Sequence, residues 1–321
     1  MVDMSKNDVL RNVLDKIKPK KEERELMDRF VSKVNETAES IGKVYSVKPM
    51  LCGSVAKNTW ISNKFELDMF LLFTPSTSRK ILEERGLEIA EKIIKELNGS
   101  FEKKYSEHPY LCATIKFENV KFDVDIVPCY DIKELKKIKS SVDRTPHHVR
   151  FVKKNLLLPD DARFLKQFCK AAGIYGADVK TNGFSGYLCE LLIINYGKFE
   201  NCVKAASKWR APAVVTITNM NKEKLAKTYK VPLIVIDPVD ANRNVAAAVS
   251  IENFYKFVEA SKKFVTNPSE KLFFSDKIKP YSVDEIEKRI ENRGTRWYAV
   301  RFDKPKVVDD ILYPQMRRCE N

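Results

Sequence analysis

The chain has 321 residues, of which 44% are hydrophobic and 10% aromatic, so it is long enough for about two or three compact units with a sizeable core. Its 58 lysines and arginines exceed its 44 acidic residues and give a formal net charge of +14, which favours a polyanionic partner such as RNA. No stretch approaches about 18 consecutive apolar residues, and the N-terminus lacks the pattern of a secretory signal. We therefore expect a globular protein that is neither exported nor membrane-spanning.

The seven cysteines do not indicate a disulfide framework or a zinc site. Their number is odd, and no two of them have C-x-x-C spacing. The three histidines, His108, His147 and His148, show no zinc-ligand spacing with them. Reduced thiols in a cytoplasmic protein are the simplest account.

Residues 1–150 are predicted to form one α/β unit with a mixed sheet. Apolar residues recur at helical spacing through the first 45 residues, and a strand over 44–51 then leads to a Gly-Ser turn. The elements expected after this turn are a helix-like segment at 55–60, a strand at 65–73, a helix at 79–98, and strands near 101–106, 111–118 and 120–127.

After residue 150 the apolar spacing becomes mainly helical. Residues 151–212 are expected to form a helical neck that makes the second wall of a cleft, and residues 213–321 a separate α+β body. The expected elements are helices at 161–172 and 186–196, strands at 213–218 and 231–236, helices at 244–250, 251–264 and 283–292, and a strand at 296–302.

Two acidic residues interrupt the apolar run from 65 to 73. An isolated charge is costly to bury unless a cation meets it, so these acids indicate a function rather than a contribution to stability. Residues i and i+2 of a strand share a face about 6.5–7 Å apart, which makes Glu66 and Asp68 a candidate pair of metal-ligating carboxylates. Upstream, Gly53 and Ser54 offer backbone N–H groups and a hydroxyl to a phosphate. Together these features indicate Mg²⁺-assisted nucleotidyl transfer.

A third carboxylate is expected on a neighbouring strand. The segment 120–128 is rich in β-forming residues, carries acids two positions apart, and ends at a proline. Asp123 and Asp125 would share one face, and periodicity alone leaves open which of them is the ligand. Two edge strands with polar outer faces would show the same alternation, although the Gly-Ser turn argues against that alternative.

Longer motifs at seven places narrow the interpretation. They lie at 53–60, 66–68, 107–110, 124–130, 142–148, 173–190 and 237–247. Together they resemble the archaeal, class I CCA-adding enzymes, which are polymerase-β-type nucleotidyltransferases. The resemblance extends from residue 20 to residue 316. It implies a polymerase-β-like head with a mixed sheet, a helical neck and an α+β body.

The same resemblance implies an activity and a set of site residues. The implied activity is ordered addition of C, C and A to the 3′ end of tRNA, with CTP and ATP as substrates and two Mg²⁺ ions as cofactors. The implied catalytic and metal-binding residues are Glu66, Asp68 and Asp125. The implied nucleotide-binding residues are Gly53, Ser54, Lys57, Thr145, His148, Lys166, Tyr175 and Arg243.

Three of these positions also make physical sense by themselves. Lys166 and Tyr175 would lie on opposite sides of a continuous helix, but Gly173 breaks that helix and lets Tyr175 return to the same cleft. The fixed fork of donors on Arg243 suits the edge of cytosine or adenine together with an RNA phosphate.

The chain departs from the family pattern in two respects. Lys57 stands where the family usually has arginine, so charge is kept but bidentate geometry is lost. The motifs end near Gln315, whereas family members continue into the rest of the body and a tail that grips the far end of the acceptor stem. We therefore expect an incomplete body without that tail. A short or split enzyme with a second subunit, a homodimer, a truncated chain and a different RNA substrate all remain open.

Two alternative functions also remain open. One keeps the chemistry but adds only C, only A or another 3′ terminus to RNA. The other is an RNA-binding subunit without catalysis, against which the three carboxylates argue because they would repel RNA.

Overall fold

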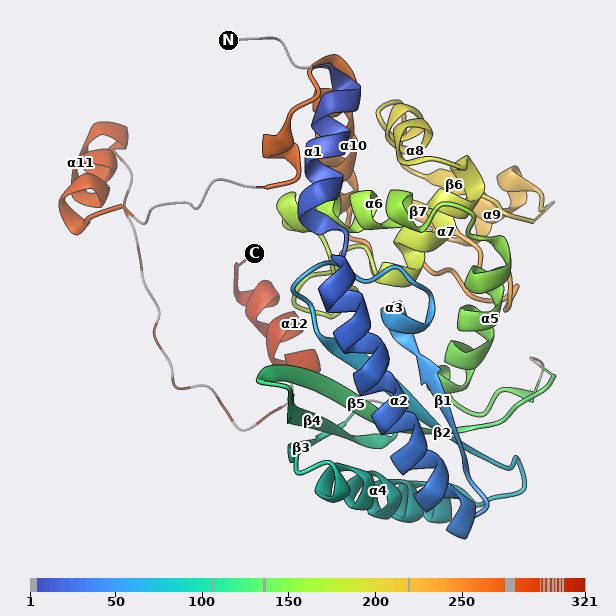
Figure 1. Ribbon diagram of the computed structural model, residues 1–321. Helices are drawn as coiled ribbons and strands as arrows, with labels where there is room; N and C mark the ends of the chain where they lie inside the picture. Colours follow the sequence, from blue (N-terminus) through green and yellow to red (C-terminus); the bar gives the residue numbers. More distant parts are fainter. Residues whose placement is uncertain are drawn as a thin grey trace.

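The computed structural model describes residues 5–320 except 106, 135–136, 219, 275–280, 295, 297, 299–300, 302, 304, 306 and 308. A mixed sheet with two long helices forms one half of the molecule, and a cluster of helices with a small second sheet forms the other (Figure 1). This α+β arrangement agrees with the fold class predicted from the sequence.

The main sheet has five strands in the order β1-β2-β5-β4-β3. Only β2 and β5 pair in parallel, and the other neighbours are antiparallel, so the sheet is mixed as expected. Its strands are β1 (Lys48–Cys52), β2 (Glu66–Phe73), β3 (Ser100–Tyr105), β4 (Pro109–Phe117) and β5 (Val120–Tyr130).

Helices α2 (Lys21–Val44) and α4 (Arg79–Glu96) cover one face of this sheet. The face of α2 that packs on the sheet carries Phe30, whose ring stacks on Phe122 of β5 with the ring centroids 3.8 Å apart. Along β2, Leu67, Met69 and Leu71 are buried in the same cluster. Strand alternation therefore sends the intervening acidic residues of β2 to the opposite face of the sheet.

The opposite face is covered at one end only. There Phe70 and Leu72 of β2 pack with Val149 of α5 (Thr145–Asn155). The other end of this face, where β2 and β5 begin, carries the carboxylates of both strands.

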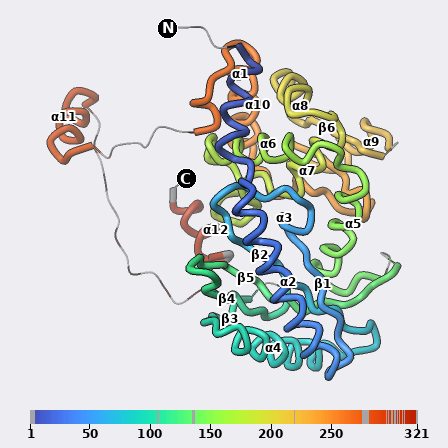
Figure 2. The backbone as a smooth tube through the Cα atoms, viewed as in Figure 1, coloured from blue at the N-terminus to red at the C-terminus, as the bar shows by residue number. Residues whose placement is uncertain are grey.

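A second large cluster of buried residues joins most of the remaining elements. Helix α1 packs against α6 (Figure 2), and its buried residues belong to the same cluster as those of α10. The cluster includes buried residues on both sides of residue 212, where the sequence analysis separates neck from body. Its elements are α1 (Lys6–Ile17), α6 (Pro159–Ala171), α7 (Gly186–Tyr196), α8 (Phe199–Ala206), β6 (Ala213–Val215), β7 (Leu233–Val235) and α10 (Ile251–Thr266).

The other described elements are short or peripheral. Helix α12 lies near the loop at 178–182, where Arg317 donates hydrogen bonds to the carbonyls of Val179 and Lys180. No helix among the described residues is long and apolar enough to cross a membrane. These elements are α3 (Gly53–Ala56), η2 (Ser141–Arg144), α9 (Lys222–Thr228), η3 (Glu270–Leu272), α11 (Val283–Arg293) and α12 (Asp309–Glu320).

Some predicted elements differ from the structure. The helix expected at 244–250 is wrong, because Asn244 uses its side chain to bind the backbone of Val235 and Ala246 and so holds a series of turns. The first strand begins at Lys48 rather than at 44, because α2 continues to Val44. The strand expected at 296–302 lies partly outside the described residues.

Phe30→Ala should destabilise the chain by about 3–5 kcal/mol, because it leaves a cavity between α2 and the sheet. Phe101 of β3 is 41% exposed and provides a matched control, for which Phe101→Ala should cost about 1 kcal/mol or less. Urea unfolding of both variants measures the difference. Equal losses would contradict the packing described for α2.

Candidate active site

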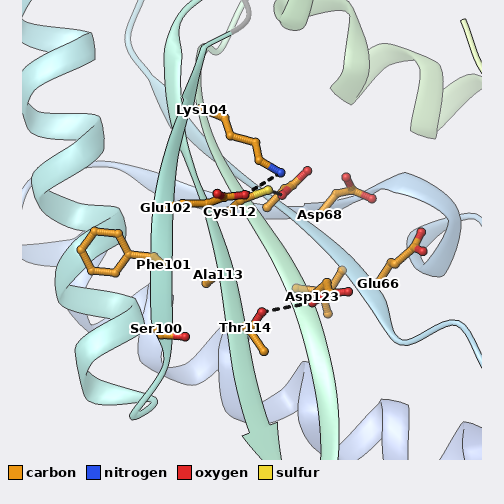
Figure 3. Close-up of a pocket in the computed structure, with 12 residues that line it drawn as sticks. Glu66, Asp68, Ser100, Phe101, Glu102, Lys104, Cys112, Ala113, Thr114 and Asp123 are labelled. Atoms are coloured by element: carbon orange, nitrogen blue, oxygen red, sulfur yellow. Dashed lines mark hydrogen bonds and ion pairs between the residues drawn. The ribbon is translucent and has the colours of Figure 1, made fainter. Parts of the chain in front are cut away.

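Four carboxylates from two parallel strands lie together on the open part of the sheet. The register of β2 and β5 pairs Glu66 with Asp123 and Asp68 with Asp125. All four residues line one cavity of about 580 Å³, and Figure 3 shows three of them along its floor. The spacing of two residues on each strand thus produces a group of acids, as the sequence pattern predicted.

Strand β4 contacts both acids of β5 from the other side. The thiol of Cys112 donates to Asp125 Oδ1, and the hydroxyl of Thr114 donates to Asp123 Oδ1 over 3.2 Å. In Figure 3 the side chain of Thr114 points toward Asp123. Strand periodicity does not distinguish Asp125 from Asp123, but the pairing of the strands does. Asp125 lies beside Asp68 of β2, whereas Asp123 lies beside Glu66.

The charge on Asp68 is poorly balanced by its surroundings. Burial raises the pKa of its carboxyl group to about 6, and the negative charges of Asp125 and Glu66 act in the same direction. Lys57 and Lys166 oppose this increase but do not cancel it. A cation at this place would remove the repulsion, and a set of oxygen ligands is the type that hard divalent cations prefer.

The geometry fits a metal ion that is shared with a substrate. Within the described ranges, no three His, Cys, Asp or Glu side chains lie close enough to hold a metal ion by themselves. Mg²⁺ in proteins is usually bound through one or two carboxylates together with water and substrate phosphates. Glu66, Asp68 and Asp125 have the chemistry of such a partial ligand set.

Gly53 brings the backbone against this group of acids. It has a φ of +64°, and a Cβ atom built on it would lie 1.7 Å from Oδ2 of Asp68. The residue before it, Cys52, pairs with Asp68 across β1 and β2. Only glycine fits here, and Ser54 follows directly.

A second cavity of about 270 Å³ adjoins the first at Glu66, which lines both. Gly173 has a φ of +69° and ends α6, so that Tyr175 lines this cavity together with Lys166, the arrangement expected from the sequence. The residues of its wall are Ser54, Thr59, Trp60, Ile61, Lys64, Glu66, Lys166, Lys170 and Tyr175.

Glu190, a buried acid that the sequence analysis missed, forms ion pairs with two of the lysines expected to bind the nucleotide. The carboxylate of Glu190 on α7 is fully buried and accepts from Lys57 at 2.6 Å and from Lys166 at 2.8 Å. Thr59 donates to the same carboxylate over 2.6 Å and also accepts from Lys166. The ammonium group of Lys57 was expected to face a triphosphate, but in the structure it is engaged with Glu190.

The charges explain the ionisation of this cluster. Burial alone would raise the pKa of Glu190, but Lys166 and Lys57 outweigh it and hold the pKa at about 2. Burial lowers the pKa of Lys166, and Glu190 counteracts that decrease. A sequence signal for Glu190 exists, because it is the only charged residue of α7.

Two of the three remaining expected residues contact a second buried acid, Asp237, which the sequence analysis also did not single out. Thr145 is the first residue of α5 and His148 follows within its first turn, so the 145–148 segment is helical. His148 Nε2 lies 2.8 Å from Asp237, and Arg243 lies 2.9 Å from the same carboxylate oxygen.

The fold has known counterparts. A cytoplasmic RNA terminal U-transferase superposes with a TM-score of 0.62 at 14% identity, covering 86% of this chain and 99% of that one. The RNA terminal uridylyl transferase Cid1 gives a TM-score of 0.64, also at 14% identity and with the same shares. The protein therefore has the fold of the polymerase-β-like nucleotidyltransferases.

Sequence comparison identifies the family. Residues 160–274 match the second domain of tRNA nucleotidyltransferases, and residues 293–321 match the C-terminal domain of CCA-adding enzymes. The CCA-adding enzyme of Methanosarcina acetivorans is 40% identical over 313 residues, which cover 96% of this chain and 67% of that enzyme. The corresponding enzyme of Methanocaldococcus jannaschii is 40% identical over 336 residues, which cover 100% of this chain and 72% of that enzyme. The chain belongs to the family of archaeal CCA-adding enzymes, which confirms the resemblance found in its motifs.

The chain is shorter than its relatives. The CCA-adding enzyme of Methanoregula boonei is 41% identical over 303 residues, and these cover 94% of this chain but only 64% of that enzyme. The chain thus spans about two thirds of the length of the curated relatives that it matches.

Gly53→Ala should abolish nucleotide incorporation while the chain stays folded, because the new methyl group displaces the Asp68 carboxylate. Gly197 also has a positive φ, but a Cβ there meets nothing within 4 Å. Gly197→Ala is therefore a control for backbone strain alone and should keep its activity. Thermal unfolding and an incorporation assay on both variants test this expectation, and an active Gly53→Ala variant would contradict it.

Glu190→Gln should destabilise the chain by about 3 kcal/mol at neutral pH, because two buried ammonium groups lose their counter-charge. The folded-state pKa of Glu190, about 2, lies below its ordinary value of 4.5. Its carboxylate therefore stabilises the folded chain above pH 4.5, and this contribution is lost as the pH falls toward 2.

The difference in unfolding free energy between the wild type and Glu190→Gln should accordingly shrink between pH 7 and pH 3. Urea titrations over this range measure it. Glu39 is exposed on α2, and Glu39→Gln should show no such difference at any pH. A difference that stays constant with pH for Glu190→Gln would contradict the ion-pair assignment.

Proposed function

We propose that this chain adds C, C and A in order to the 3′ end of tRNA, with CTP and ATP as substrates and Mg²⁺ as the metal. The observation that carries the proposal is the pairing of Asp68 with Asp125 on neighbouring strands beside Gly53 and Ser54. Such a group of acids beside a turn suited to phosphate is what nucleotidyl transfer requires. Membership of the CCA-adding family supports the choice of tRNA.

In the proposed reaction the 3′-hydroxyl of the RNA releases its proton to solvent, and its oxygen forms a bond to the α-phosphorus of the nucleotide. The bond from that phosphorus to the bridging oxygen breaks, and pyrophosphate leaves with its electron pair. Mg²⁺ held by Glu66, Asp68 and Asp125 would lower the pKa of the 3′-hydroxyl and neutralise phosphate charge. The other residues bind and orient the two substrates.

Each of these residues has a proposed part in holding the nucleotide. Ser54 would donate its hydroxyl to a phosphate oxygen, and Gly53 would let the backbone approach it. Lys57 and Lys166 would supply positive charge to the triphosphate. The hydroxyl of Tyr175 would bind the sugar, since this side chain lines the same cavity as Lys166.

The remaining three positions lie on α5 and on the loop that follows β7. Thr145 and His148 lie in the first turn of α5, where side chains and backbone can donate to a phosphate or a ribose. Arg243 would donate to the edge of the incoming base. The charge of Lys57 supports placing the acids of β2 and the start of α5 in one site. It lowers the pKa of Asp68 as well as that of His148, so it acts on both elements.

The direct test is incorporation by the purified chain on tRNA that lacks its 3′ CCA, with CTP, ATP and Mg²⁺, and sequencing of the product ends. Ordered growth by C, C and A that then stops is the expected result. Addition of C alone, of A alone or of long untemplated tails would support another terminal transferase instead. No incorporation, combined with intact RNA binding, would support an RNA-binding subunit.

Asp68→Ala and Asp125→Ala should each abolish incorporation and leave tRNA affinity nearly unchanged, because they remove metal ligands rather than RNA contacts. Asp123→Ala is the matched control, since Asp123 has the same face and the same strand as Asp125 but lies beside Glu66. It should keep incorporation within about tenfold of the wild type. Retained activity in Asp68→Ala or Asp125→Ala would refute the metal assignment.

A further inference from the structure

Asp237 accepts hydrogen bonds from four groups, which lie on α5, on α7 and in the loop that follows β7. It follows β7, and its side chain is fully buried. One carboxylate oxygen bonds the hydroxyl of Tyr187 at 3.0 Å and the backbone N–H of Val239 at 3.0 Å. The other bonds His148 at 2.8 Å and Arg243 at 2.9 Å. Both oxygens of the carboxylate thus have two partners each.

Packing between two of these partners restricts their movement. The rings of His148 on α5 and Tyr187 on α7 stack with their centroids 3.9 Å apart and their planes 22° from parallel. Each ring is also bonded to Asp237, so neither can rotate without losing a hydrogen bond. The carboxylate therefore lies in a fixed frame built from two helices.

The backbone of the loop restricts Arg243 in the same way. The N–H of Asp237 donates to the carbonyl of Arg243, and the N–H of Arg243 donates to the carbonyl of Asp240. Asp240 in turn accepts from Arg144 at 2.7 Å, which ties the loop to the start of α5. Both the backbone of Arg243 and one end of its guanidinium group are thereby fixed, while 37% of its side chain stays exposed.

Arg243 is the permanently charged partner of Asp237. Burial lowers the pKa of His148, so this imidazole is neutral at pH 7 although Asp237 opposes the decrease. Burial would raise the pKa of Asp237, but the bonds from His148, Val239 and Arg243 keep it below its ordinary value. A buried carboxylate opposite one guanidinium group forms a charge-assisted bond, which is among the stronger types.

We propose that Asp237 is a positioning residue that sets the choice of base by holding the Arg243 guanidinium in one orientation. This inference rests on the proposed function, in which Arg243 meets the base. A guanidinium group only donates hydrogen bonds. It therefore pairs with O2 and N3 of cytosine, which are acceptors, and is opposed by the N3–H of uracil. Discrimination between the two depends on a guanidinium group that cannot turn away.

The test compares CTP with UTP as the first nucleotide added to tRNA lacking its 3′ CCA. Asp237→Asn keeps the size of the side chain but removes the charge that holds Arg243. The ratio of kcat/KM for UTP to that for CTP should rise by about ten- to a hundredfold, which is the discrimination that one good bidentate contact provides. The KM for CTP should rise more than its kcat falls.

The control is Glu118→Gln, which removes a carboxylate–arginine pair with Arg29 in the turn between β4 and β5, away from the loop that carries Arg243. It should leave the UTP to CTP ratio at the wild-type value. A purely structural role of Asp237 would lower incorporation of both nucleotides equally and would leave the ratio unchanged, which overturns the inference.

Tyr187→Phe covers the case in which Asp237→Asn does not fold. It removes one donor to Asp237 and keeps the ring stack with His148, so the ratio should rise by a smaller factor, about threefold or more. An unchanged ratio in Tyr187→Phe would then overturn the inference. A wild-type chain that adds neither nucleotide would overturn the proposed function as well, whereas an active wild type with unchanged ratios in the variants refutes only the role of Asp237.

Discussion

The parallel pairing of β2 with β5 sets the positions of the acids, and the elements around the sheet have to stabilise this pairing. It places Asp68 directly beside Asp125, so burial and the repulsion between the two carboxylates both oppose the charged form of Asp68. The apolar cluster under α2 and α4 supplies the rigidity that keeps these strands in register. The absence of a bulky side chain at Gly53 then lets the backbone close over Asp68. The acids of β2 therefore reduce the stability of the sheet, although the proposed chemistry needs them.

Helix α7 connects the two halves of the candidate site. Tyr187 and Glu190 are three residues apart, a spacing that places both on one side of a helix. Tyr187 donates to Asp237 beside the loop that carries Arg243, and Glu190 accepts from Lys57 and Lys166 beside the cavity of about 270 Å³. One rigid helix thus sets the distance between a group that would meet the base and groups that would meet the phosphates.

The acids of β2 were predictable because strand alternation is a local property of the sequence, and the strands of the main sheet were predictable for the same reason. Alternation does not separate Asp123 from Asp125, since they share a face, and only the family motifs suggested Asp125. The partners of Lys57 lie 133 residues away, so no local pattern reveals that its charge is already engaged. The helix expected at 244–250 failed because Asn244 binds backbone groups of other segments, a contact that helical periodicity does not encode.

The ion pair between Lys57 and Glu190 also affects how an anion enters the site. The ammonium group of Lys57 is mostly buried and pairs with the carboxylate of Glu190, so under the proposed function a phosphate that bound Lys57 would exchange one anionic partner for another. Lysine suits such an exchange, since its flexible stem carries a single rotating donor group, whereas an arginine fork would bind the carboxylate at two points. Glu190 retains Lys166 and Thr59, so the cluster, which carries one positive charge while Lys57 is bound, would become neutral if Lys57 moved to a phosphate. Under the proposed function, Glu190 would hold the ammonium group of Lys57 until a phosphate binds.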